Sequence, residues 1–180
     1  MIIGLSGYAR SGKDSVAEYL VQHHGFTRLA FADNLKQLLY DVNPIILSGG
    51  DERVQSFVDY FGWDESKKIP EVRELLQRLG ESARERIGQD VWINAVLKEA
   101  EGLDRVVISD VRYQNEANAI RFDAGGKLIR IIRYGVSSAN DHISETDLDN
   151  YSFDASIHND YTLSSLGHEV ERVMEDLDIL

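Results

Sequence analysis

Short apolar runs alternate with longer amphipathic stretches along this chain. Three runs, at residues 2–5, 105–110 and 127–133, are rich in valine, isoleucine and leucine, which is typical of strands buried on both faces. Two weaker runs, at residues 26–31 and 155–158, are also interpreted as strands. Strands that alternate with helices predict a parallel sheet with helices on both faces. We therefore expect an α/β fold, a three-layer sandwich around a five-stranded parallel sheet.

Between these runs, apolar residues recur at the three- and four-residue spacing of amphipathic helices. Glycines, prolines and capping residues indicate where each helix begins and ends. The predicted helices cover residues 13–24, 33–43, 51–61, 70–87, 90–101, 113–124 and 163–178. Residues 45–47 are apolar without a secure assignment, and residues 63–68 are expected to form a polar connector.

A glycine-rich loop follows the first strand directly. Residues Gly7 to Lys13 match the phosphate-binding P-loop, and a helical pattern begins at once behind them. The two glycines let the backbone turn its N–H groups toward a phosphate, which a Cβ atom would obstruct. The helix N-terminus adds a positive end, and Lys13 adds a charge that reaches the outer phosphates. The expected nucleotide-phosphate contacts are Gly7, Ala9, Ser11, Gly12, Lys13, Asp14 and Ser15.

The loop departs from the general P-loop at one position. Asp14 stands where a serine or threonine normally ligates Mg²⁺, and Ser15 comes one place later. A carboxylate beside a triphosphate is repelled unless a cation lies between them. Asp110 ends the strand at 105–110, where P-loop enzymes usually keep an acidic group for Mg²⁺ or its water shell. Asp14, Ser15 and Asp110 therefore all remain open as magnesium ligands.

Three arginines lie in or beside the expected strand-end loops. Arg10 is inside the glycine loop, Arg112 follows Asp110, and Arg133 ends the strand at 127–133. In open parallel sheets ligands bind beyond the carboxyl ends of the strands, so these guanidinium groups are expected at the phosphates. A surface ion pair is the alternative for Arg10, and an ion pair with Glu116 is the alternative for Arg112. Arg133 also opens a weakly periodic segment at 134–150, which is interpreted as a short lid.

A separate pair of polar residues lies on the helix at 70–87. Arg73 and Gln77 are four residues apart, so they share one helix face. A forked guanidinium beside an amide suits a phosphate-bearing ligand with a base to read. A solvated helix face is the alternative interpretation of the same spacing.

Composition limits the range of partners and compartments. The net charge of −12 argues against a binder of nucleic acid polymers and against docking on anionic membranes. The absence of cysteine excludes disulfides and thiolate zinc sites. No apolar stretch is long enough for a signal peptide or a membrane span, so a cytoplasmic protein is expected. The 180 residues suit one domain covering residues 1–180, and a homodimer is left open.

Several motifs extend along the chain beyond the glycine loop. They are Ser6-Gly-x-x-x-Ser-Gly-Lys-Asp-Ser15, Phe31-Ala-Asp-Asn-Leu-Lys36, Val72-Arg73-x-Leu-x-Gln77, Asp90-Val91-Trp92, Asp110-Val111-Arg112, Ile131-Ile132-Arg133, His142-Ile-Ser-Glu145 and Ile157-His-Asn159-Asp160. In order and spacing this set resembles the bacteriophage-type deoxynucleoside monophosphate kinases, members of the adenylate-kinase-like P-loop group. The family loop also carries aspartate after the lysine, so Asp14 becomes a shared feature.

The resemblance implies transfer of the γ-phosphoryl group of ATP, with Mg²⁺, to a deoxynucleoside monophosphate, giving the diphosphate and ADP. It implies catalytic roles for Arg10, Lys13, Asp14, Arg112 and Arg133, and an adenine contact for Asn159. It places the acceptor nucleotide in the region of about 33–88. The acceptor contacts that it implies are Phe31, Asp33, Lys36, Arg73, Gln77, Trp92, Asp110, Arg112, His142 and Glu145.

The resemblance leaves some questions open. The segment at 43–70 has no matching motif, so the preferred base is not indicated. The Ser-Gly-Lys-Asp loop also occurs outside nucleotide kinases, so a related kinase of phosphomevalonate or dephospho-coenzyme A is an alternative. A P-loop switch protein that hydrolyses nucleotide slowly is a further alternative. If the chain is encoded by a phage, the expected compartment is the host cytoplasm.

Overall fold

The computed structural model describes residues 1–138, 146–160 and 162–180. The chain divides into two compact units. Unit 1 comprises Met1–Ala30 with Val96–Leu180, and unit 2 comprises Phe31–Ala95. The region of about 33–88, predicted for the acceptor nucleotide, falls within unit 2.

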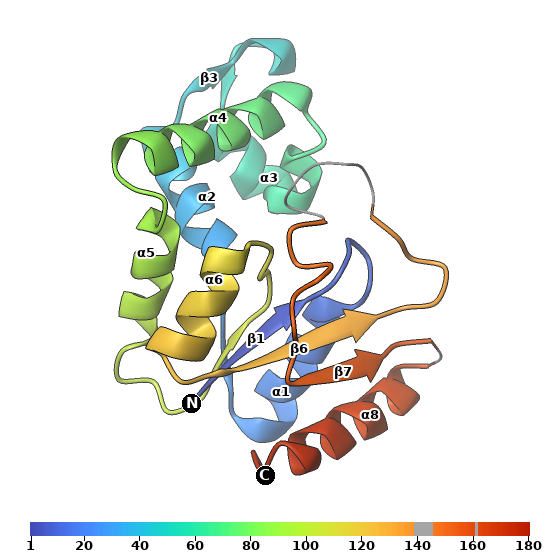
Figure 1. The fold of residues 1–180 in the computed structure, drawn as a ribbon. Helices are drawn as coiled ribbons and strands as arrows, with labels where there is room; N and C mark the ends of the chain where they lie inside the picture. Colours follow the sequence, from blue (N-terminus) through green and yellow to red (C-terminus); the bar gives the residue numbers. More distant parts are fainter. Residues whose placement is uncertain (139–145, 161) are drawn as a thin grey trace. The chain divides into compact units, whose positions relative to one another are not determined.

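Unit 1 is built on a five-stranded parallel sheet (Figure 1). Its strands are β1 (Ile2–Ser6), β2 (Thr27–Leu29), β5 (Val106–Ile108), β6 (Lys127–Ile132) and β7 (Ala155–His158). The spatial order is β2-β5-β1-β6-β7, with β1 paired in parallel to β5 on one side and to β6 on the other. The predicted five-stranded parallel sheet is therefore confirmed, and the strand that precedes the glycine loop lies at its centre.

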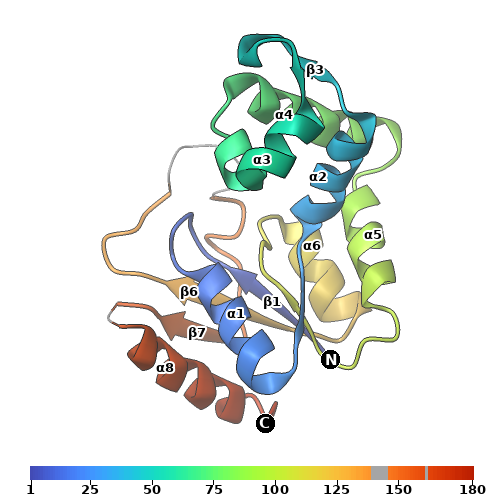
Figure 2. The ribbon, with the colours of Figure 1, turned by 180° about the vertical axis from the view of Figure 1, so that it is seen from behind.

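Helices cover both faces of this sheet, as predicted (Figure 1, Figure 2). Helices α1 (Lys13–His24) and α8 (Leu163–Asp176) pack on one face, where Ile3 and Leu5 point into the main core. Successive strand residues face opposite sides, so Gly4 points the other way, toward Ile120. That face is covered by α6 (Gln114–Asn118) and by η2 (Ala119–Asp123), which is one π-helical turn.

Unit 2 consists mainly of helices. They are α2 (Phe31–Val42), α3 (Val54–Ser66), α4 (Pro70–Arg86) and the first half of α5 (Val91–Ala100), which enters unit 1 at Val96. A short antiparallel pair, β3 (Ile45–Ile46) and β4 (Glu52–Arg53), flanks the 3₁₀ turn η1 (Leu47–Gly49). The core of unit 2 is centred on Leu39, Ile46, Val54 and Val72.

Three local predictions between residues 26 and 68 were wrong. The strand predicted at 26–31 is shorter, because Phe31 already begins α2 and is buried at 4% exposure. Asp33 therefore lies in the first turn of α2 and does not precede that helix. The connector predicted at 63–68 is largely helical, since α3 continues to Ser66 through a kink at Gly62, where φ is 75° and ψ is 169°.

The segment predicted as a lid, residues 134–150, lies partly outside the described residues. After that gap the chain resumes at Thr146, and Leu148 is buried at 5% exposure. Among the described residues, no helix has the length and apolar character needed to cross a membrane.

Candidate phosphate-binding site

The glycine loop joins the central strand β1 to helix α1. Its backbone has positive φ at Gly7 (142°), Arg10 (67°) and Gly12 (102°). A Cβ atom on Gly7 would lie 2.3 Å from the Ile131 carbonyl oxygen, and one on Gly12 would lie 2.1 Å from Nδ2 of Asn159. Glycine is therefore required at both positions by conformation and by space. The spacing that identified the P-loop in the sequence reflects this close packing.

Lys13 begins α1, and its side chain folds back over the loop. Its Nζ donates to the carbonyl oxygens of Gly7 at 2.7 Å and Tyr8 at 2.9 Å, and the residue is only 9% exposed. The hydroxyl of Ser11 is buried and has no hydrogen-bond partner among the described residues. The loop thus holds one ammonium group at its carbonyls and one hydroxyl with unused hydrogen-bonding capacity.

The chain that leaves β5 runs beside this loop. The backbone N–H of Val111 donates to the carbonyl of Leu5 at 3.1 Å, one residue before β1 ends. Asp110 and Arg112 on either side of Val111 are half-buried. The Glu116 carboxylate accepts the backbone N–H of Arg112 at 2.8 Å, and Glu116 is 3% exposed. Asp110 and Arg112 therefore lie just after the end of β5, which stops at Ile108 and pairs with β1, and the strand predicted to run to Asp110 is shorter than expected.

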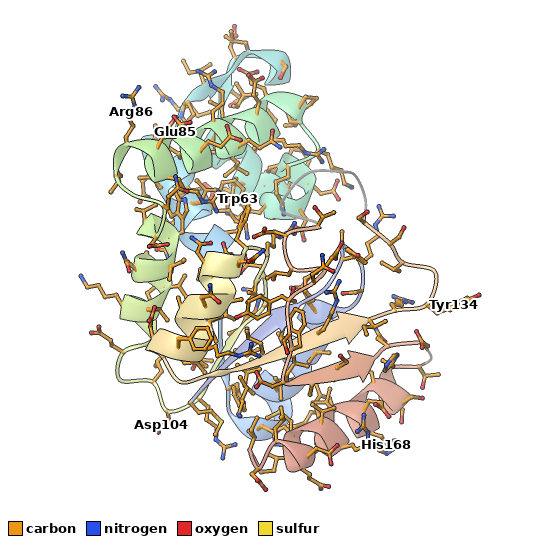
Figure 3. All side chains as sticks on the ribbon, in the orientation of Figure 1. Trp63, Glu85, Arg86, Asp104, Tyr134 and His168 are labelled. Carbon is orange, nitrogen blue, oxygen red and sulfur yellow. The ribbon has the colours of Figure 1, made fainter. Side chains whose placement is uncertain are left out.

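Arg133 and Asn159 follow the ends of the next two strands, β6 and β7. Arg10 and Arg133 are exposed, and neither side chain forms an ion pair within the described parts of the chain. Tyr134, next to Arg133, is 91% exposed and extends from the edge of the unit (Figure 3). Asn159 is buried at 9% exposure and donates from Nδ2 to the Ser11 carbonyl at 2.8 Å. Parallel strands thus place these groups at the carboxyl edge of one sheet.

Arg130 belongs to a cluster that the sequence did not reveal. The Tyr8 hydroxyl donates to Asp149 Oδ1 at 2.8 Å, and Arg130 donates to the same oxygen at 2.9 Å. The Arg130 guanidinium also lies 5.5 Å from the centre of the Tyr8 ring and 5.4 Å from that of Phe153. Tyr8 and Asp149 are 141 residues apart, so no local pattern links them. The cluster ties the glycine loop to the segment that follows residue 145.

The hydrogen bond from Tyr8 to Asp149 raises the pKa of the Tyr8 phenol above its ordinary value of 10.0, and burial and the Asp149 charge act in the same direction. The phenol therefore stays protonated near neutral pH and remains a donor. Because its pKa is higher in the folded state, its contribution to stability is complete below the unfolded pKa. That contribution declines as the pH rises through the folded pKa.

The residues predicted to contact the acceptor differ in how accessible they are. Phe31 and Trp92 are buried at 4% and 7% exposure, and the Trp92 indole N–H donates to the Gly80 carbonyl at 3.4 Å. Asp33 is ion-paired with Lys36 at 2.7 Å on the first turn of α2. Arg73 and Gln77 are both exposed on α4. His142 and Glu145 lie outside the described residues.

The candidate Mg²⁺ ligands are oxygen donors, which suit this ion. No cluster of three or more histidine, cysteine or acidic side chains suited to a metal occurs within the described ranges. Mg²⁺ in phosphoryl-transfer sites usually takes one or two carboxylates and completes its shell with phosphate oxygens and water. An exposed Asp14 and a half-buried Ser15 on the first turn of α1, with a half-buried Asp110, suit that mode of binding.

A hollow of about 510 Å³ opens between the end of β7 and the first turns of α8. Its lining includes His158, Asn159, His168 and Arg172, and Figure 3 shows His168 on α8. Asn159 therefore lines this hollow and also contacts the glycine loop.

The strand–glycine loop–helix unit within this sheet defines a P-loop protein. The family model for deoxynucleotide monophosphate kinase matches residues 61–170. A candidate deoxynucleotide monophosphate kinase of Acanthamoeba polyphaga mimivirus is 30% identical over 194 residues, which cover 94% of each chain. The chain therefore belongs to the deoxynucleotide monophosphate kinase family.

Two solved structures of other kinases are among the proteins to which this chain is similar. Shikimate kinase from Aquifex aeolicus is 12% identical, with a TM-score of 0.49 and 99% of each chain covered. Dephospho-CoA kinase from Campylobacter jejuni is 15% identical, with a TM-score of 0.49 and coverage of 98% of this chain and 96% of that one. At these values the likeness says nothing about the substrate.

Replacing Tyr8 by phenylalanine tests the cluster of Tyr8, Arg130 and Asp149. The variant loses one hydrogen bond to a charged acceptor, so we expect the free energy of unfolding to fall by about 1 kcal/mol at pH 7. The difference in the free energy of unfolding between the two proteins should narrow as the pH rises from about 10 through the raised folded-state pKa, because the phenol ionises first in the unfolded state and then in the folded state. Urea unfolding of both proteins at pH 7 and at a pH above 10 measures both effects. Tyr134→Phe, at an exposed position, should be neutral, and a Tyr8→Phe variant as stable as wild type at pH 7 would contradict this assignment.

Proposed function

We propose that this protein transfers the γ-phosphoryl group of ATP to a deoxynucleoside monophosphate, giving the diphosphate and ADP. The observation that carries the proposal is the glycine loop itself. Its two constrained glycines and its buried lysine lie at the end of the central strand, beside the Asp110–Arg112 segment. Membership of the deoxynucleotide monophosphate kinase family supports the assignment of ATP as donor and a deoxynucleotide as acceptor.

The donor phosphates are assigned to the loop. Its backbone N–H groups and Lys13 bind the β- and γ-phosphates, while the start of α1 contributes the positive end of a helix. Arg10, Arg112 and Arg133 neutralise the charge spread over the transferring phosphoryl group. Two phosphates held in line need little covalent assistance, so the mechanism requires no protein nucleophile.

Mg²⁺ is assigned to the same end of the loop. When bound, the ion would supply positive charge that offsets the negative charge of the phosphates. Asp14, Ser15 and Asp110 are the residues that would hold it, directly or through water, and their exposed or half-buried positions leave room for phosphate and water ligands.

The acceptor contacts are assigned to unit 2. Arg73 and Gln77 present a guanidinium and an amide on one exposed face of α4, which suits a phosphate and a base. Asp33 and Lys36 supply a further polar pair on α2. Phe31 and Trp92 are buried, so their proposed contribution is to the packing of unit 2 rather than to direct contact with the ligand.

A Lys13→Met variant tests the donor site. Methionine keeps the apolar stem of the lysine side chain but lacks the ammonium group. Because that positive charge would no longer stabilise the transferring phosphoryl group, kcat should fall at least 100-fold. The assay follows ADP release with Mg-ATP against dAMP, dGMP, dCMP, dTMP and the ribonucleotides. Lys98→Met, at an exposed position on α5, is the control and should keep full activity. Unchanged turnover in Lys13→Met would refute the assignment, and ADP release indifferent to every acceptor would favour a different phosphorylated substrate.

An Arg73→Gln variant tests the acceptor side. Loss of a charge-assisted hydrogen bond to the monophosphate should raise the KM for the acceptor about tenfold or more. The KM for ATP should change less than about twofold, since ATP is bound by the glycine loop. Arg78→Gln, exposed on the same helix, is the matched control and should alter neither constant. Equal losses for both substrates would place Arg73 outside the acceptor site.

A further inference from the structure

We propose that Asn159 is a positioning residue that holds the glycine loop in its phosphate-binding conformation. The inference rests on the proposed function, because it assumes that the loop binds phosphate. It differs from the adenine contact that family resemblance implies for the same residue. Ligands with and without a base distinguish the two roles.

Asn159 is fixed from both its backbone and its side chain. Its backbone N–H donates to the carbonyl of Ile132, the last residue of β6, at 2.8 Å. Its Nδ2 donates to the Ser11 carbonyl at 2.8 Å, across 148 residues of sequence. The residue is buried at 9% exposure. A short, buried bond between rigidly held groups restrains the loop more firmly than a solvent-exposed one would.

The side-chain amide also occupies the space that a glycine leaves empty. Its Nδ2 lies 2.1 Å from the position that a Cβ atom of Gly12 would take. Gly12 is therefore needed for the left-handed backbone at φ 102° and also for the approach of Asn159. The loop and the residue after β7 fit together as one packed unit.

The bond to Ser11 fixes the direction of the next peptide N–H. In a trans peptide the carbonyl and the following N–H point in nearly opposite directions, and no cis peptide occurs within the described ranges. Holding the Ser11 carbonyl toward Asn159 therefore turns the Gly12 N–H away from Asn159. Backbone N–H groups of this kind are the main phosphate ligands of a P-loop.

Asn159 and Lys13 restrain the loop in different ways. Lys13 binds the carbonyls of Gly7 and Tyr8, and it is also the group assigned to the phosphates. The Ser11 carbonyl is held by Asn159, whose role does not require a contact with the ligand. The bond from Asn159 can therefore persist when a phosphate is bound.

The test compares a ligand that has a base with one that has none. Calorimetric titrations with Mg-ATP and with Mg-tripolyphosphate are run on wild type, Asn159→Ala and Asn159→Leu. Leucine has a similar size to asparagine but cannot donate a hydrogen bond. Since the Ser11 carbonyl loses its partner in both variants, we expect affinity to fall about tenfold for both ligands alike. Asn150→Ala, at an exposed position, should match wild type.

Two patterns would overturn the proposal. Weaker ATP binding with unchanged tripolyphosphate binding would make Asn159 a base contact. Unchanged affinity for both ligands, with only a lower Tm, would make it a purely structural residue. Failure of the proposed function gives a different result: wild type that binds both ligands without phosphorylating any monophosphate leaves the role of Asn159 intact. Wild type that binds neither ligand would overturn both proposals.

Discussion

Parallel pairing of β1 on both of its edges is the constraint on which the candidate site depends. Pairing with β5 and β6 sets the register Ile3↔Val107 and Gly4↔Leu128, so the ends of all three strands reach the same edge of the sheet. The glycine loop follows β1, the Asp110–Arg112 segment begins two residues after β5, and Arg133 follows β6. Strand order thereby brings functional groups that are more than a hundred residues apart in the sequence to one edge of the sheet.

The conformation of the loop depends on groups that come from several parts of unit 1. Lys13, itself part of the loop, binds two of its carbonyls, and Asn159, which follows β7, binds a third. Asp149 accepts a hydrogen bond from the hydroxyl of Tyr8. A loop with positive φ at three positions is costly to order, and such contacts offset that cost before any ligand binds. Because the loop is already ordered, less of the binding free energy of the phosphate is used to order it.

Patterns that depend on neighbouring residues were readable from the sequence, and contacts between distant residues were not. Val106–Ile108 and Lys127–Ile132 were predicted because both are short runs rich in valine, isoleucine and leucine. The glycine loop was predicted because its spacing follows from its packing. The hairpin of β3 and β4 has only two residue pairs, which is too short for an alternation to show. The helix predicted at 51–61 stops before Gly62, yet the positive φ of Gly62 bends α3 without ending it. The contacts of Tyr8 with Asp149 and of Asn159 with Ser11 span 141 and 148 residues.

The most direct test of phosphoryl transfer follows the phosphoryl group itself. Wild-type protein is incubated with Mg²⁺ and ATP labelled in its γ-phosphate, together with each deoxynucleoside monophosphate, and the labelled products are separated. A P-loop kinase of this family should place the label in a deoxynucleoside diphosphate, at a rate that depends on the acceptor supplied. Label that appears only as inorganic phosphate, at the same rate with and without acceptor, would contradict the assignment of this protein as a deoxynucleotide monophosphate kinase.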